Sequence, residues 1–124
     1  MVNQSLQVLV VDDVAVNRLL AQTFLTRMGH VVHELDSGVA ALGWLALRLD
    51  IDLLLLDINM PELSGEEVCT QLRAKPAHAP LKIVAYTAHA GAEDQQRFLS
   101  RGFDAVLVKP ISIQRLSDTI NGLF

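Results

Sequence analysis

The chain has 124 residues, of which 51% are hydrophobic, and a formal net charge of −4, so we expect one domain over residues 1–124 with an apolar core of its own. No apolar run approaches the roughly 18 residues of a membrane span, no basic block favours direct nucleic-acid binding, and Met1–Ser5 lacks the basic flank and apolar core of a signal peptide. The single cysteine, Cys69, excludes an internal disulfide and suits a reducing, cytoplasmic location.

Short apolar runs alternate with amphipathic segments along the whole chain. In chain order, they predict strands over residues 6–11, 31–35, 52–57, 81–86 and 105–108. The four leucines before Asp57 form a run that is too short for an ordinary helix and fits a strand buried on both faces. Polar residues interrupt the segment 31–35, which we therefore expect at an edge of the sheet.

The segments between these strands have helical spacing. Intervals of four predict a buried face of the first helix that carries Val16, Leu20, Phe24 and Met28. Gly29 is a natural end for this helix. Ser37 can cap a second helix, whose apolar face is predicted to carry Leu42, Leu45 and Leu49.

Three more helices are predicted in the second half of the chain. Ser64 and Glu67 have the spacing of a capping box, a weaker helix ends near Gly102, and the last begins near Ser112. Strands that alternate with helices predict an α/β domain: a parallel sheet with helices on both faces, joined by right-handed crossovers.

Charged and polar side chains stand at the carboxyl ends of four predicted strands. They are Asp12 and Asp13, Asp57, Thr87 and Lys109. Because the carboxyl ends of parallel strands share one edge, these side chains should converge there. Three close carboxylates repel one another unless a cation lies between them, and oxygen ligands favour Mg²⁺. Each residue taken alone has a simpler interpretation: a helix cap, a turn residue, a strand end or a solvated lysine.

The ordered set, with Met60–Pro61 and Gly65 inside it and Pro110 at its end, resembles the response-regulator receiver domain of two-component signalling, from Leu6 to Leu123. The resemblance implies a flavodoxin-like, three-layer, doubly wound (βα)5 sheet in the order 2-1-3-4-5. It also implies phosphorelay signalling with Mg²⁺ as cofactor. A sensor histidine kinase and a histidine phosphotransfer domain would be the partners of a monomer that catalyses only its own phosphorylation and dephosphorylation.

The resemblance assigns roles to the acidic residues. Asp57 is implied to be the phosphoacceptor, a carboxylate nucleophile that forms an acyl phosphate. Asp13, Asp57 and the backbone carbonyl of Asn59 would bind Mg²⁺, and Asp12 would help directly or through water. The cation would neutralise charge on the phosphoryl oxygens.

The resemblance also assigns roles around the phosphoacceptor. Lys109 would pair with Asp57 at rest and with a phosphoryl oxygen afterwards, and Thr87 would donate its hydroxyl to another oxygen. Ala88 would leave room for the phosphodonor, and His89 would lie at the rim of the pocket. The bond between Lys109 and Pro110 is expected to be cis.

Several features resemble the receivers joined to hybrid sensor kinases. They are Leu107 in place of the common aromatic residue, the pair Asn17–Arg18 and the stretch 86–90. With Leu107 the switch should work through small loop shifts. Asn17, Arg18 and Ala21, expected on the exposed side of the first helix, would bind the partner.

Other functions are compatible with parts of the pattern. A stand-alone response regulator would act by phosphorylation-dependent protein binding, and we expect no output domain after the last helix. An aspartate-nucleophile phosphatase would need an acid where the chain has Asn59. A flavin carrier would need a phosphate-binding loop in place of Asp12–Asp13, whose charge repels phosphate.

Overall fold

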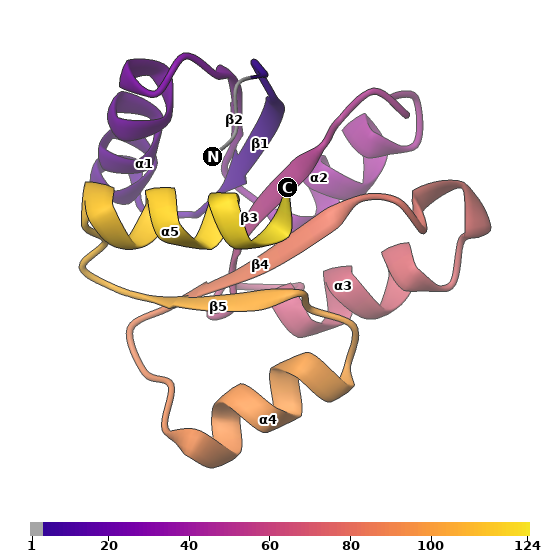
Figure 1. Ribbon diagram of the computed structural model, residues 1–124. Coiled ribbons are helices and arrows are strands. Elements are labelled where there is room, and N and C mark those ends of the chain that lie inside the picture. The colour runs from indigo at the N-terminus through magenta and orange to yellow at the C-terminus, as the bar shows by residue number, and fades with distance from the viewer. Residues whose placement is uncertain (1–3) are drawn as a thin grey trace.

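A computed structural model describes residues 4–124 as a five-stranded parallel sheet, in the order β2-β1-β3-β4-β5, between two layers of helices (Figure 1). The strands are β1 (Gln7–Val11), β2 (Val31–Leu35), β3 (Leu53–Asp57), β4 (Lys82–Thr87) and β5 (Ala105–Val108). The helices are α1 (Ala15–Arg27), α2 (Gly38–Leu45), α3 (Gly65–Arg73), α4 (Ala92–Ser100) and α5 (Ile113–Leu123), with a short 3-10 turn η1 (Pro76–His78). The predicted fold class and strand order are confirmed.

Part of the expectation for Met1–Ser5 falls on residues 1–3, which lie outside the described residues. Within residues 4–124, no helix has both the length and the apolar character needed to cross a membrane. The prediction that β2 lies at an edge is confirmed by the strand order.

Each inner strand supplies apolar side chains to both faces of the sheet. Val8 and Val10 join the cluster under α1 and α5, whereas Leu9 and Val11 join the cluster under α2, α3 and α4. The four leucines of β3 alternate in the same way, and none is more than 1% exposed. A strand covered on both faces reads as a continuous apolar run, which is why β3 could be predicted from the sequence.

The predicted buried face of α1 is partly wrong. Val16 is 67% exposed, while Ala21 and Leu25 are fully buried; Leu20, Phe24 and Met28 pack at the border of the core. A spacing of four advances about 40° further than a full turn at every step. Over three steps the predicted stripe therefore winds around the helix, so that Val16 at its start lies off the sheet, and the true face is centred on Ala21 and Leu25.

The second predicted helix ends earlier than expected. α2 stops at Leu45, and Leu49 lies outside it, 69% exposed. The backbone N–H of Arg48 bonds to the carbonyl of Leu45, and its guanidinium makes two 2.8 Å hydrogen bonds to Asp50. A tight turn of this kind closes the helix and carries the following residues away from its apolar face.

Helix α3 begins as its sequence predicted, with Ser64 and Glu67 forming both halves of a capping box. Cys69 on this helix is buried, and burial raises the pKa of its thiol to about 11. The thiol is therefore neutral and packs as a small hydrophobic side chain. At the end of α3, Arg73 donates to the carbonyls of Gly102, His78 and Leu81. It also pairs with Asp104 at 2.7 Å, which ties the entrances of β4 and β5 to the helix.

Candidate functional site

Four charged side chains meet at the carboxyl edge of the sheet. Lys109 Nζ lies 2.9 Å from Asp12 Oδ2 and 3.2 Å from Asp57 Oδ1. Asp12, Asp13 and Asp57 each bring one carboxylate oxygen to within 4.8 Å of the others. Asp12 and Asp57 are buried, whereas Asp13 is exposed at the rim. The predicted convergence of these residues is therefore confirmed.

The strand register explains the convergence. Val11, the last residue of β1, is paired with Leu56, so Asp12 follows β1 level with Asp57, the final residue of β3. Thr87 at the end of β4 is paired with Val108, which directly precedes Lys109. Parallel strands that end at the same level place all of these side chains on one edge.

The two oxygens of Asp12 have different surroundings. Oδ1 accepts a 2.8 Å hydrogen bond from the backbone N–H of Val14, two residues further along the chain, as in an Asx turn. Oδ2 is buried and faces Lys109 as an ion pair, but no described residue gives it a hydrogen bond of regular geometry. The capping interpretation of Asp12 does not hold, because Val14 is the N-cap residue of α1, and Oδ2 of Asp12 is turned into the site.

The electrostatics of the cluster fit a cation. Burial, followed by the nearby charge of Asp12, raises the pKa of Asp57 to about 7, although the ammonium of Lys109 opposes the shift. Three carboxylates are thus incompletely balanced by one lysine. Oxygen ligands at this spacing, one of them without a regular hydrogen bond, are the donor set that Mg²⁺ prefers.

The remaining predicted site residues surround the carboxylates. The backbone N–H of Asn59 donates to Asp57 Oδ1 at 3.3 Å. The hydroxyl of Thr87 donates to the carbonyl of His89 at 3.1 Å and accepts from its N–H, so it is held within its own loop. Ala88 and His89 are exposed at the rim. The peptide bond between Lys109 and Pro110 is cis, as expected, and Leu107 is buried in β5.

One residue beside the site was not assigned from the sequence. Tyr86 is 1% exposed, and its ring centroid lies 4.6 Å from Lys109 Nζ. Burial and the charges of Asp12 and Asp57 raise the pKa of its phenol to about 12. A buried aromatic residue in a strand is typical of a core, so no sequence pattern could have indicated this contact.

Gly65, at the start of α3, packs directly against the phosphoacceptor candidate. Its N–H bonds to the carbonyl of Ile58 at 3.0 Å, and a Cβ at this position would collide with the backbone carbonyl of Asp57. Only glycine allows the helix to approach the end of β3 so closely.

Replacing Gly65 with alanine should therefore lower the free energy of unfolding by roughly 1–3 kcal/mol, as overpacking does. The backbone of Asp57 should move with it, and urea unfolding measures the change. The matched control is Gly43→Ala in α2, where a Cβ meets nothing within 4 Å. This control should gain about 0.4–1 kcal/mol; equal effects at both positions would contradict the assignment.

The predicted partner surface needs one correction. Asn17 and Arg18 are half-buried beside the site, and Arg18 donates to the carbonyl of Asp12 at 2.6 Å. Ala21, however, is fully buried against the sheet and offers nothing to a partner. The small side chain is there because α1 packs closely on the sheet. The apolar side chains exposed at the start of α1 are Val16 and Leu19, at 67% and 61%, and that of the N-cap residue Val14, at 43%.

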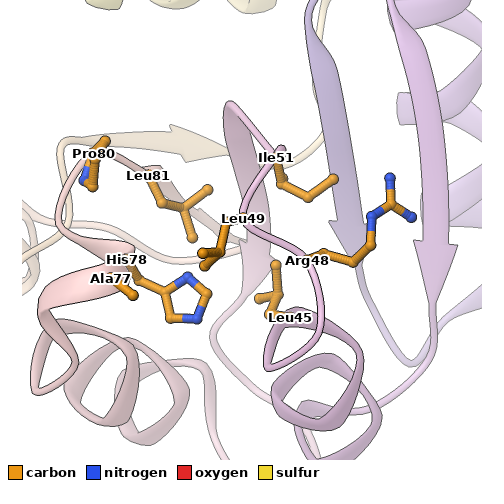
Figure 2. A pocket seen from close by; sticks show the side chains of 8 residues that line it. All are labelled: Leu45, Arg48, Leu49, Ile51, Ala77, His78, Pro80 and Leu81. Atoms are coloured by element: carbon orange, nitrogen blue, oxygen red, sulfur yellow. The ribbon is translucent and has the colours of Figure 1, made fainter.

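A small pocket lies at the opposite edge of the sheet, where β3 and β4 begin (Figure 2). Its volume is about 30 Å³, and its lining includes Ile51, His78 and Leu81. This is room for about one water molecule, and the acidic residues lie at the other ends of the strands. The site is therefore the acidic edge and not this pocket.

The sequence matches the family model described as response regulator receiver domain over residues 8–121. The chain belongs to this family. The match begins at the second residue of β1 and covers the other four strands and most of α5, the last helix. It favours neither the aspartate-nucleophile phosphatase nor the flavin carrier.

Several hybrid sensor kinases contain a similar receiver domain. The chain is 40% identical over 118 residues to the sensor histidine kinase GacS of Pseudomonas protegens, covering 92% of this chain and 13% of that protein. It is 36% identical over 118 residues to the sensor histidine kinase RcsC of Salmonella typhi, covering 95% of this chain and 12% of that protein. The chain thus spans about an eighth of the length of these relatives, and the similarity to receivers of hybrid kinases is confirmed.

Solved receiver structures share the fold. The chemotaxis response regulator CheY4 of Vibrio cholerae superposes with a TM-score of 0.90 at 26% identity, covering 98% of this chain and all of that one. The receiver domain of the sensor histidine kinase PA1611 of Pseudomonas aeruginosa gives 0.86 at 25% identity, covering 97% and 98% of the two chains. That second structure has a magnesium ion coordinated in its active site cleft.

Proposed function

We propose that this receiver domain accepts a phosphoryl group on Asp57 from a phosphohistidine and passes it to a histidine phosphotransfer domain. The observation that carries the proposal is the buried carboxylate of Asp57, 3.2 Å from Lys109 and grouped with two further carboxylates. We take residues 1–124 as one such domain. It is not an enzyme acting on a separate substrate, since it changes only its own phosphorylation.

The chemistry is a displacement at phosphorus. An oxygen of Asp57 forms a bond to phosphorus while the bond from phosphorus to the histidine nitrogen breaks, and the imidazole keeps the electron pair. The product is an acyl phosphate. Asp57 is the last residue of β3, a rigid strand. This position fixes the direction from which its carboxylate attacks phosphorus.

Mg²⁺ would be held by Asp13, Asp57 and the backbone carbonyl of Asn59, with Asp12 contributing directly or through water. When bound, it supplies positive charge that neutralises the phosphoryl oxygens. The charge on the described residues is consistent with this: three carboxylates and one lysine leave a deficit of two positive charges.

Lys109 and Thr87 would respond to the phosphoryl group. On phosphorylation, the negative charge of Asp57 passes to the phosphoryl oxygens. The ammonium of Lys109 would therefore leave the carboxylate of Asp57 and pair with a phosphoryl oxygen. The hydroxyl of Thr87 would give up its bond to the carbonyl of His89 and donate to a phosphoryl oxygen. Because His89 follows in the same loop, this exchange would move the start of the β4–α4 connection, whereas Leu107 carries no aromatic ring to move with it.

Acetyl phosphate tests the proposal without a partner protein. With Mg²⁺, the intact protein should gain one phosphate, about 80 Da, and acetate should leave with the electron pair. The gain should disappear when EDTA removes the cation. A protein that gains no mass with Mg²⁺, or gains it equally with EDTA, would contradict the proposal.

The partners follow from the same chemistry. The relatives are receivers of sensor histidine kinases, so the donor we propose is a kinase phosphohistidine and the acceptor a four-helix histidine domain. Because such kinases use ATP, we place the domain in the cytoplasm. We further propose that it acts as a monomer. The histidine must reach Asp57, which makes the exposed side of α1 beside the site the docking surface.

Replacing Leu19 with glutamate tests that surface. Leu19 is 61% exposed, so the variant should melt like the wild type and accept phosphate from acetyl phosphate at the same rate. Transfer to a histidine phosphotransfer domain should slow about tenfold, because a charge replaces an apolar contact at the centre of the interface. Stopped transfer reactions resolved on phosphate-affinity gels measure the rate. The control is Leu99→Glu on α4, 50% exposed; equal slowing by both variants would refute the surface on α1.

A further inference from the structure

The ammonium of Lys109 has three charged or polarised neighbours, and one of them is aromatic. It lies 2.9 Å from Asp12 Oδ2, 3.2 Å from Asp57 Oδ1 and 4.6 Å from the ring centroid of Tyr86. The side chain of Lys109 is only 16% exposed. The ring of Tyr86 therefore stands where water would otherwise contact the ammonium, and its negative face attracts the positive charge.

The ring itself is held firmly. Tyr86 is paired in the sheet with Asp57 on one side and Leu107 on the other, so it lies between the phosphoacceptor strand and the lysine strand. It is 1% exposed and belongs to the apolar cluster under α1 and α5. A side chain locked by packing can fix the position of a flexible neighbour.

From this arrangement we infer that Tyr86 is a positioning residue for Lys109: its ring holds the ammonium over the carboxylates so that it meets the phosphoryl group. The neighbouring position in β5, Leu107, is aliphatic, so the aromatic ring next to the site comes from β4 instead. This inference rests on the proposed function for its kinetic consequence only. The contact between ring and ammonium is independent of it.

Replacing Tyr86 with leucine keeps an apolar side chain and removes the ring face. The rate of phosphate gain from acetyl phosphate should fall about fivefold, the loss expected from one partly desolvated cation–π contact. Tyr86→Phe keeps the face and should retain the wild-type rate. Phe103→Leu is the matched control, because Phe103 is 3% exposed but packs on the opposite face of the sheet.

Nuclear magnetic resonance gives a readout that general destabilisation would not reproduce. Tyr86 is the single tyrosine of the chain, so ring labelling of tyrosine is specific for it. In the wild type and in Tyr86→Phe, the ε-methylene protons of Lys109 should be shifted upfield by the ring. In the wild type they should also show cross-relaxation with the labelled ring protons of Tyr86. Both signals should be lost in Tyr86→Leu and kept in Phe103→Leu.

The outcomes separate the two proposals. Wild-type protein without phosphate gain overturns the proposed function, and the resonance of Lys109 still decides the positioning role. If the ε-methylene protons of Lys109 show no upfield shift in the wild type, this result overturns the inference, even if Tyr86→Leu does not fold. So does a wild-type phosphorylation rate in Tyr86→Leu, or an equal loss of rate in Phe103→Leu.

Discussion

A protein with asparagine in place of Asp57 should gain no phosphate from acetyl phosphate and Mg²⁺, whereas the wild type gains one. Asparagine has nearly the same shape, but its amide is not a nucleophile at phosphorus, and no other carboxylate of the cluster ends a central strand in the same way. The loss should be complete. Intact mass spectrometry after equal incubation measures it.

The control for this change is Asp50→Asn. Asp50 carries an exposed carboxylate in a turn, where the Arg48 guanidinium lowers its pKa to about 2. It lies before β3, at the edge of the sheet opposite the acidic cluster, and should leave phosphate gain unchanged. If Asp57→Asn still gained one phosphate, the phosphoacceptor would be another residue.

The second large effect concerns the strand that carries Asp57. Replacing Leu54 with alanine should lower the free energy of unfolding by about 2–5 kcal/mol, because the site is fully buried and the removed atoms leave a cavity. The urea midpoint should fall with an unchanged slope, which shows that stability changed and the unfolded state did not.

Leu47→Ala makes the same chemical change at an exposed position. Leu47 is 88% exposed, and surface substitutions of this kind usually alter stability by less than about 0.5 kcal/mol. The difference between the two variants separates the effect of burial from the effect of shortening a leucine side chain. Losses that differ by less than about 1 kcal/mol would show that β3 is not the centre of the core.

Local patterns were sufficient to predict most elements of this domain. The leucine run of β3, the capping box of Ser64 and Glu67, and the alternation of strands with helices are signals between neighbouring residues, and each is found in the structure. The carboxylates of the site could also be predicted. Parallel strands that end at the same level bring residues far apart in the sequence to one edge.

The errors came from contacts that apolar spacing does not describe, one between a helix and the sheet and one within a turn. The buried face of α1 was placed on Val16 and not on Ala21, because spacing alone does not give the angle at which a helix meets a sheet. The end of α2 before Leu49 depends on a turn closed by Arg48 and Asp50. Neither interaction is encoded in apolar periodicity.

The sequence by itself determined the strands, the polar residues at their carboxyl ends and the residues that could bind a cation, because these depend on local composition and on chain direction. Only the tertiary structure decided which side of α1 is exposed and which ring contacts Lys109. Both depend on packing across the sheet, where Tyr86 of β4 meets the lysine that follows the adjacent strand β5. A pairing of this kind is set by the three-dimensional register of β3, β4 and β5.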